Sequence, residues 1–156
     1  QKTSKGFYNY SEGSRAPNPA PENEDIYKEI SSQNNIKRRE ISDQEIIDRC
    51  ILALVNEGAR ILEEGVAQRS GDMDIVYING YGFPIWRGGP MFYANQLGLS
   101  EVIKKMGDFS ELDENFWKPA PLLKKLADES GVFGEAPALE DRSELLSFKN
   151  ANMGGV

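Results

Sequence analysis

The sequence predicts an all-α protein, a helical bundle preceded by an extended N-terminal linker. Apolar residues after residue 42 recur at the three- and four-residue spacing of helix faces, and capping residues, prolines and glycines fall where these stretches begin and end. No segment shows the alternation of apolar and polar residues that is typical of strands. Residues 42–148, about 110 in all, would form the bundle, which is long enough to bury a workable core.

The linker covers residues 11–41, which are rich in Pro, Asn, Ser, Glu and Lys and poor in large apolar side chains. Three prolines at alternate positions between residues 17 and 21 favour extended backbone. Two isoleucines one turn apart predict a short helical turn at residues 24–31. With so little apolar surface, this segment is not expected to bury a core of its own.

The bundle is expected to begin with a long helix from Ser42 to about Ala67. Ser42 and Glu45 have the spacing of a capping box, in which the hydroxyl binds a backbone amide and the carboxylate reaches back. Gly58 in the middle costs about 1 kcal/mol relative to Ala, so we expect another backbone to approach closely there. Cys50, the only cysteine, is expected to be an inert thiol in the buried face. That face would consist of Ile46, Ile47, Cys50, Ile51, Leu54, Val55, Ala59, Ile61, Leu62 and Val66.

Further helices are predicted at residues 70–79, 90–98, 100–107, 121–131 and 143–148. Ser70 or Asp72 would cap the first of these, and Pro90 suits the first turn of the second. Gly98 and Gly131 would end two of them. Four glycines between residues 80 and 89 predict a shaped loop.

Composition and charge exclude several classes of function. The 18 basic and 25 acidic side chains give a net charge of −7, which disfavours nucleic acid and anionic membranes as partners. No apolar run approaches the roughly 18 residues that a membrane span needs. The chain has no histidine and one cysteine, so it can form neither a His-based catalytic dyad nor a Cys/His zinc site. We expect it to bind no metal and no cofactor.

The first candidate site is the pair of carboxylates Asp72 and Asp74, with Glu57 on the preceding helix. In principle these groups could transfer protons or hold a hard cation. Their spacing is specific for neither of these functions, and a structural role is favoured. Asp72 would cap its helix, and Asp74 would lie in the first turn, where a negative charge complements the helix dipole.

The second candidate is the loop of residues 80–90, which leads into a helix N-terminus, an arrangement that favours phosphate binding. Arg87 would add a cation. The loop matches no nucleotide-binding motif. The favoured alternative is a tight turn that packs Phe83 and Trp86 onto the bundle.

The third candidate comprises Arg49, Asn56 and Glu57 on the long helix. Asn56 lies seven residues, or two turns, after Arg49 and therefore on the same face. Polar groups beside an apolar face usually fix neighbouring loops through hydrogen bonds, and we expect that role here.

These residues also carry a family resemblance. Residues 48–99 resemble the C-terminal helical repeat of 3-hydroxyacyl-CoA dehydrogenases, and most of all the second such repeat of multifunctional fatty-acid oxidation proteins. The resemblance consists of one set of residues in one order with matching gaps: Arg49, Asn56, Glu57, Glu64, Gly65, Asp72, Asp74, Gly80, Gly82, Phe83, Pro84, Gly89, Pro90 and Gly98. Residues 117–131 are similar to the closing helix of that repeat, and residues 5–10 to the end of the first repeat.

The resemblance also implies where the chemistry of such a protein resides. In that family the polypeptide carries an enoyl-CoA hydratase and isomerase module, an NAD-binding domain and two helical repeats, and it oxidises 3-hydroxyacyl-CoA with NAD. Hydride transfer uses a His and a Glu of the NAD-binding domain and an Asn of the first repeat. This chain has no His, no Rossmann glycine motif, and Asp48 in place of that Asn. An aspartate cannot donate the amide N–H and would repel a developing anion, so we expect no catalytic residue here.

The implied role is that of a scaffold domain, inactive alone, whose full-length parent binds NAD. Its partners would be the NAD-binding domain and the first helical repeat of the same polypeptide, and a homodimer is a further expectation. Residues 1–10 would be the tail of the preceding repeat and 149–156 a flexible tail, and the chain, which starts at Gln1, would be a fragment. The candidates for packing and interface roles are Arg49, Asn56, Glu57, Asp74, Gly82, Phe83, Pro84, Arg87, Gly89 and Pro90.

Two alternatives stay open: a free-standing helical protein-interaction module, and a domain that binds the phosphates of coenzyme A through Arg87. An interface role predicts that several of the aromatic residues Phe83, Trp86, Phe92 and Tyr93 are exposed over roughly several hundred Å². The chain does not end in a peroxisomal S-K-L signal, so we expect a cytoplasmic setting of the bacterial type.

Overall fold

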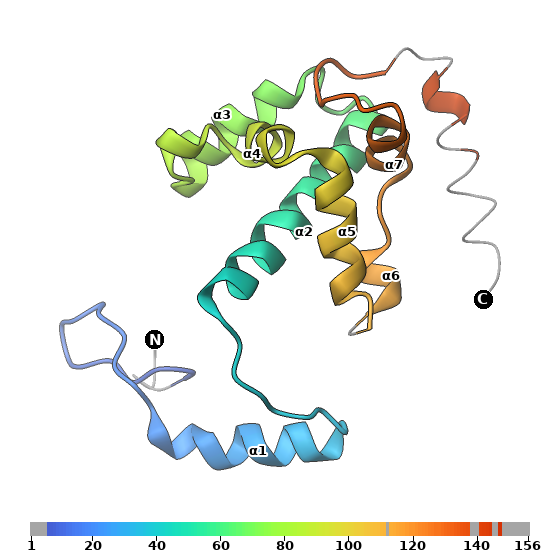
Figure 1. Cartoon of the computed structure of the whole chain (residues 1–156). Coiled ribbons are helices and arrows are strands. Elements are labelled where there is room, and N and C mark those ends of the chain that lie inside the picture. The colour runs from blue at the N-terminus through green and yellow to red at the C-terminus, as the bar shows by residue number, and fades with distance from the viewer. Residues whose placement is uncertain (1–5, 112, 138–140, 145–146, 148–156) are drawn as a thin grey trace. The chain divides into compact units, whose positions relative to one another are not determined.

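The computed structural model describes residues 6–111, 113–137, 141–144 and 147. Within these residues the secondary structure is helical and contains no strand, which confirms the predicted all-α class (Figure 1). Contacts divide the chain into two units, Gln1–Ile41 and Ser42–Val156. In the part of the chain that the structure describes, no helix is long and apolar enough to cross a membrane.

The first unit contains a 3-10 turn, η1 (Pro21–Asn23), and a helix, α1 (Glu24–Gln33). The helix is longer than the turn predicted at residues 24–31. Asn9 and Asn18 exchange two backbone hydrogen bonds of 3.0 and 2.8 Å, and the side-chain amide of Asn23 donates to the carbonyl of Gly6 at 2.7 Å. None of the described residues of this unit is buried, in agreement with its low apolar content.

The second unit begins with helix α2 (Asp43–Glu63), whose N-terminus is capped as predicted. The Ser42 hydroxyl accepts a hydrogen bond from the backbone amide of Glu45 at 3.2 Å. The helix ends four residues before the expected Ala67 because Gly65 adopts a positive φ of 68°. The amide of Val66 then bonds back to the carbonyl of Ile61 at 3.1 Å, the arrangement by which many helices close.

The remaining elements are α3 (Ser70–Tyr81), the 3-10 turn η2 (Ile85–Arg87), α4 (Pro90–Leu97), α5 (Leu99–Phe109), α6 (Glu114–Trp117) and α7 (Pro121–Asp128). Helix α6 was not predicted from periodicity, because one turn is too short to show a pattern. It is capped by Asp113, which accepts from the amide of Phe116 at 2.9 Å. Of the helix expected at residues 143–148, residues 143, 144 and 147 are helical, and the others lie outside the described residues.

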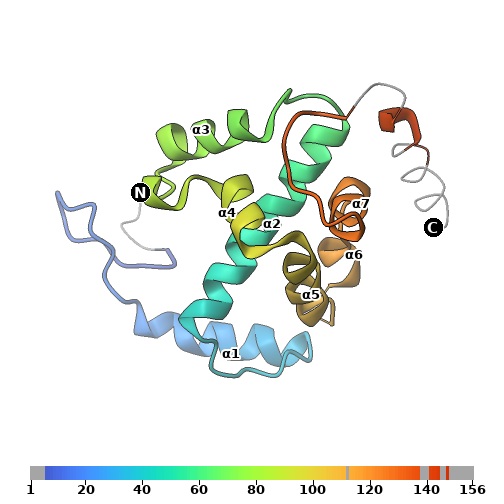
Figure 2. The same cartoon turned by 45° about the horizontal axis from the view of Figure 1, so that its top comes forward.

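Helix α2 runs through the middle of the second unit and contacts α3, α4, α5 and α7 (Figure 2). Its buried face is narrower than predicted and is centred on Leu52, Val55, Ala59 and Leu62. Cys50 is exposed, so its assignment to the core was wrong. The reason is helical geometry, since Cys50 and Leu52 are two residues, or about 200° of rotation, apart. Ile46, Ile47 and Val66 are also exposed.

Gly58 faces the other helices of the bundle, as expected for a glycine that allows a close contact. The group that approaches it is not a backbone. A Cβ atom at residue 58 would collide with the sulfur of Met91 on α4. The prediction of a close contact at Gly58 was therefore correct, but the contacting group is a side chain and not a backbone. The glycine lets a methionine side chain lie directly against α2.

Candidate functional site

Asp74 joins two consecutive helices of the bundle. It lies in the second turn of α3 and is 7% exposed. Its carboxylate accepts hydrogen bonds from the backbone amides of Met91 at 2.8 Å and Phe92 at 3.1 Å, the first free amides of α4. Asp74 thus caps α4 and not its own helix, which corrects the predicted role. Burial raises the pKa of the Asp74 carboxyl above its ordinary value of 3.8, although the two amide hydrogen bonds act in the opposite direction.

The predicted capping of α3 by Ser70 or Asp72 is also wrong. Arg69 occupies the cap position, and no side chain bonds to the free amides there. Asp72 instead forms an ion pair with Arg69, with 3.0 Å between Nη2 and Oδ1. Asp72 and Asp74 therefore act in separate interactions, and neither the acid–base pair nor the shared cation site considered for them is formed.

Gly89 and Pro90 form the other half of the Asp74 contact. Gly89 has a φ of 96°, and a Cβ atom there would overlap with the Asp74 carboxyl group. Pro90, the first residue of α4, has no N–H that would need a partner. Because Asp74 already binds the amides of residues 91 and 92, a phosphate could reach them only by displacing a buried carboxylate. The geometry thus contradicts phosphate binding at this helix end.

Between α3 and α4, residues 82–88 form a fixed turn. Gly82 ends α3 in the left-handed conformation, and the amide of Phe83 donates to the carbonyl of Tyr77 at 3.0 Å. Phe83 is buried as predicted, whereas Trp86 is 74% exposed and does not pack onto the bundle. The cause is η2, which begins after Pro84 and carries Ile85 and Trp86 outward.

Arg87 is held by aromatic rings. Its guanidinium lies over the ring of Trp86, 4.4 Å from the centroid, and over the ring of Tyr93, at 5.4 Å. Such contacts orient a cation and leave its N–H groups able to bind an anion. The exposed turn therefore presents an apolar surface with an oriented positive charge beside it.

Asn56 fixes the segment between α6 and α7, as predicted. Its amide nitrogen donates to the carbonyl of Lys118 at 3.0 Å, and its oxygen accepts from the amide of Ala120 at 2.8 Å. Two turns further along α2, the buried Glu63 accepts a hydrogen bond from the amide of Leu122 and so caps α7. Sequence reasoning missed Glu63, although a lone acid seven residues after Asn56 on a buried face was the available signal.

Arg49 and Glu57, the other two residues of the third candidate site, do not bind the segment between α6 and α7. The guanidinium of Arg49 lies 5.2 Å from the ring centroid of Phe109 and pairs with Glu45 on its own helix. Glu57 is exposed and pairs with Arg60 at 3.1 Å. Only Asn56 therefore has the predicted anchoring role.

A second asparagine, also missed, fixes the segment that follows α7. Asn95 on α4 accepts from the amide of Phe133 at 2.8 Å and donates to its carbonyl at 3.0 Å. Next to it, the amide of Ser70 donates to the carbonyl of Gly134 at 2.7 Å. These contacts hold residues 133 and 134 against the start of α3.

Asp48, which is buried, and Lys105, which is partly exposed, form an ion pair between α2 and α5. The distance between Nζ and Oδ2 is 2.7 Å, and the side-chain amide of Gln44 donates to the other carboxylate oxygen at 2.8 Å. The hydrogen bond to Asp48 is the largest cause that raises the pKa of Lys105 above its ordinary value. At the position where the resemblance implies an Asn in the catalytic repeat, this chain thus has an acceptor that two donors already bind.

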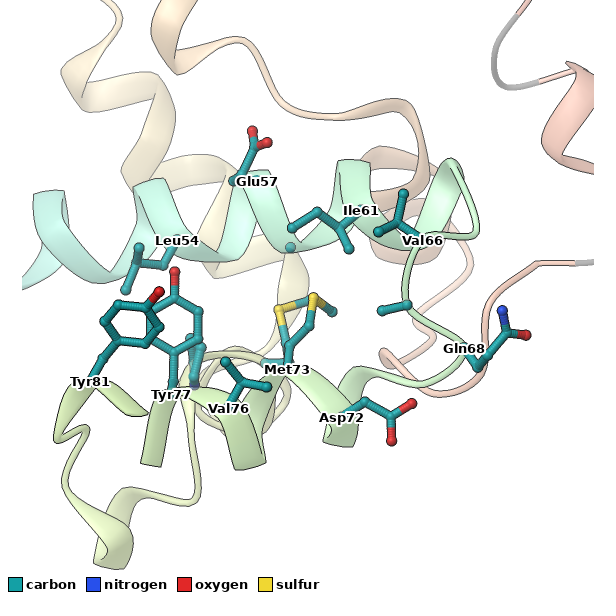
Figure 3. Close-up of a pocket in the computed structure, with 14 residues that line it drawn as sticks. Leu54, Glu57, Ile61, Val66, Gln68, Asp72, Met73, Val76, Tyr77 and Tyr81 are labelled. Atoms are coloured by element: carbon teal, nitrogen blue, oxygen red, sulfur yellow. The ribbon is translucent and has the colours of Figure 1, made fainter. Parts of the chain in front are cut away.

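A groove lies between α2 and α3, with a volume of about 460 Å³ (Figure 3). Met73 and Met91 lie in it, flanked by Leu54, Ile61 and Val76. Glu57, Gln68, Asp72, Tyr77 and Tyr81 contribute polar groups to the same groove. No sequence signal predicted this groove, because it exists only where the two helices diverge.

Comparison with known proteins gives one consistent result. The chain is 43% identical to a peroxisomal bifunctional enzyme of Danio rerio over 129 residues, which is 81% of this chain and 18% of that protein. It is 39% identical to the peroxisomal bifunctional enzyme of Cavia porcellus over 98% of this chain and 21% of that protein. It is 33% identical to the fatty acid oxidation complex subunit alpha of Acinetobacter baumannii over 86% of this chain and 19% of that protein. The chain thus spans about a fifth of the length of the curated relatives that it matches. No protein-family model matches it.

Proposed function

Because this chain is homologous over most of its length to one segment of the multifunctional fatty-acid β-oxidation enzymes, we propose that it is the non-catalytic helical domain of such an enzyme. Its role is to pack against the NAD-binding domain and the first helical repeat of the same polypeptide. The parent enzyme oxidises 3-hydroxyacyl-CoA to 3-ketoacyl-CoA with NAD, and this chain supplies neither the proton acceptor nor the dinucleotide site.

One observation carries the non-catalytic role. By the family resemblance, Asp48, which forms an ion pair with Lys105, stands at the position of the Asn from which the catalytic repeat donates an amide N–H to the reacting oxygen. A carboxylate there offers no donor, and its negative charge opposes an alkoxide or enolate.

Packing is the role that the other features support. The polar side chains of Asn56, Glu63 and Asn95 bind backbone groups within the bundle itself. Outside the bundle, the exposed turn of residues 85–87 presents the composition, Trp and Arg, that is enriched at the centre of protein interfaces. The same observation fits the alternative of a free-standing interaction module, because both roles need an apolar contact surface.

A direct assay tests the proposal. The purified chain is mixed with NADH and acetoacetyl-CoA, and absorbance at the NADH band is followed, with a full-length relative as the positive control. We expect no oxidation by the wild-type chain or by D48N, because the His, the Glu and the dinucleotide site are missing in both. Turnover that scales with the amount of chain would overturn the proposal.

A second assay tests the packing role. The rest of the parent polypeptide is produced without this segment, alone or together with the chain as a separate molecule. We expect the two pieces to co-purify and the thermal midpoint of the larger piece to rise when both are present. Failure of the pieces to associate, with both folded, would favour the free-standing module.

The compartment is part of the proposal. Relatives from animals and plants are named peroxisomal or glyoxysomal, and one relative is bacterial. We infer that the compartment follows the source of the chain, so that the expected cytoplasmic setting applies to a bacterial source only. Fractionation of the source cells with an antibody to this chain decides between the two.

A further inference from the structure

We propose that the segment of residues 36–42 is a processing site, cut by an endoprotease that is specific for Lys and Arg. The reaction is hydrolysis of the peptide bond after Lys37 or after Arg38. One water molecule is consumed, a carboxylate and an amino group are formed, and no other reactant is needed. The inference goes beyond the proposed function, since cleavage here separates the bundle from the residues that precede it.

The backbone of this segment is open to a protease. Residues 36–42 lie between α1 and α2, are exposed, and belong to no helix or turn (Figure 1). The amide of Ile36 bonds to the carbonyl of Ser31 at 2.8 Å, and among the described residues the amides of residues 37–41 make no backbone hydrogen bond. A protease binds its substrate as an extended strand through backbone hydrogen bonds, so it needs an exposed backbone without such bonds. This segment offers one without prior unfolding.

The side chains of the segment suit a protease of this specificity. Lys37, Arg38 and Arg39 are three consecutive basic residues. An acidic specificity pocket accepts Lys or Arg as the residue before the cleaved bond. Arg38 pairs with Glu24 at 3.0 Å, but the two side chains are 46% and 48% exposed, so this surface pair is weak and can be exchanged for the carboxylate of a pocket. The bonds after Lys37 and Arg38 therefore both fit such an enzyme.

Other basic residues in the described part of the chain offer poorer sites. Arg15 lies in a loop that two backbone hydrogen bonds between Asn9 and Asn18 close, so the loop cannot extend while they persist. Lys28 lies within α1. In the bundle, the described basic residues outside helices lie in a backbone bridge, in a 3-10 turn or directly before a proline: Arg69, Arg87 and Lys118. Only at residues 37–39 do basic side chains and an open backbone therefore coincide within the described ranges.

Cleavage leaves the bundle complete. Ser42, whose hydroxyl caps α2 by accepting from the amide of Glu45, lies after both bonds and stays with the bundle. Every described residue that is buried belongs to the second unit. The C-terminal product thus keeps both its first helix cap and its apolar core, whereas the N-terminal product has no buried residue to hold it.

Limited proteolysis of the full chain tests the site, with trypsin as the probe. The native chain is incubated with a small amount of trypsin, and mass spectrometry identifies the earliest products. We expect the first cut between residues 37 and 40, followed by accumulation of a C-terminal product that keeps a helical far-UV circular dichroism spectrum. A first cut after Arg15 or within the bundle would overturn the proposal, as would rapid loss of the C-terminal product.

Variants test the role of the basic side chains. The triple variant K37Q, R38Q and R39Q should slow the first cut at least about ten-fold, because the pocket of the protease loses its charged partner. The matched control is R15Q, which removes a basic residue of the same unit and should change the rate less than about two-fold. Circular dichroism verifies that both variants are folded. An unchanged rate in the triple variant would contradict cleavage at residues 37–39.

A protease of another specificity tests the backbone separately. Glu40 is exposed in the same segment. A Glu-specific endoprotease should therefore cut after Glu40 in the native chain, at a similar rate in wild type and in the triple variant. Resistance of this bond in the native wild type would show that the segment is closed and would overturn the proposal. The NADH assay does not depend on either digestion, so failure of the processing site and failure of the proposed function are distinguishable.

Discussion

At the scale of single residues, Asp74 links two helices of the bundle through one side chain. One carboxylate binds two amides that are 17 and 18 residues further along the chain. A helix N-terminus is usually capped by a residue next to it in sequence. Here the cap comes from the neighbouring helix, so it also fixes how α3 and α4 pack. Secondary structure and tertiary contact therefore depend on the same side chain.

The D74N variant should lower the free energy of unfolding by about 1–3 kcal/mol. An asparagine keeps one acceptor oxygen, but its NH₂ group would face the second amide donor and leave it without an acceptor. Urea denaturation at pH 7 measures the loss. The control is D72N, whose exposed ion pair with Arg69 should be worth less than about 1 kcal/mol. Equal losses in both variants would contradict the capping role.

The raised pKa of Asp74 predicts a pH dependence with a definite sign. Because the pKa in the folded protein lies above the ordinary 3.8, the contribution of this carboxyl to stability is full below pH 3.8. It declines as the pH rises through the folded pKa and is constant above it. The difference in free energy of unfolding between wild type and D74N should therefore be larger below pH 3.8 than at pH 7. A difference that grows from acid to neutral pH would show that the pKa is lowered.

Gly89 has no tolerance for a side chain. In G89A the new methyl group would overlap with the Asp74 carboxyl and would also force alanine into a φ of 96°, so we expect a loss of at least about 3 kcal/mol. The control is G80A in α3, where a Cβ meets nothing within 4 Å. That substitution should stabilise the protein by about 0.5–1 kcal/mol, since alanine is the better helix former. Thermal unfolding of both variants compares them directly.

At the scale of elements, polar side chains of α2 determine where α7 lies. Asn56 binds the backbone of residues 118 and 120, and Glu63 binds the amide of residue 122. These three bonds satisfy backbone groups that the helix start would otherwise leave buried without partners. These hydrogen bonds therefore fix a single register for the apolar contact between α2 and α7.

Truncation of Asn56 tests this arrangement. N56A should lower the free energy of unfolding by about 1–3 kcal/mol, because the buried amide of Ala120 loses its acceptor and the carbonyl of Lys118 loses one of its two donors. The neighbouring E57A removes an exposed side chain and should change stability by less than about 0.5 kcal/mol. Chemical denaturation monitored by Trp117, which is buried against Phe109, reports on this part of the bundle. A loss in E57A as large as in N56A would contradict the anchoring role.

The sequence pattern predicted the elements better than it predicted the contacts between them. The starts of α2 and α4 were correct because the capping box at Ser42 and the proline at residue 90 are local signals. The exposure of Cys50 was missed because a broad apolar stripe does not show which part of it faces the neighbours. The partners of Asp74 and Glu63 could not be predicted, since both contacts depend on residues brought together only by folding.

At the scale of the whole molecule, the two units differ in kind. The second unit has a continuous apolar core that includes Leu52, Leu62, Met106 and Leu123. The first unit has no buried residue among those described, and its contacts include backbone hydrogen bonds between Asn9 and Asn18 and a ring contact between Phe7 and Tyr27. Stability should therefore be distributed unevenly along the chain.

Hydrogen exchange should show this difference. Amides of residues 6–41 are expected to exchange near the rate of an unfolded chain or of a weakly held helix, whereas the central turns of α2 should exchange only through global unfolding. Mass spectrometry of peptides from the two regions measures both at once. Protection of α1 equal to that of α2 would mean that the first unit is covered by apolar contacts.

The contact between Asp74 on α3 and Gly89 before α4 limits the substitutions that this protein can accept during evolution. Asp74 needs the space that Gly89 leaves, and the Asp74 carboxyl is one of two reasons for Gly89 to remain glycine, the other being its φ of 96°. Each substitution on its own is costly, whereas loss of the acid removes the steric constraint on its neighbour. Lineages descended from this chain should therefore rarely replace Gly89 while Asp74 is present, and where Asp74 alone is replaced the φ of 96° still favours glycine at residue 89.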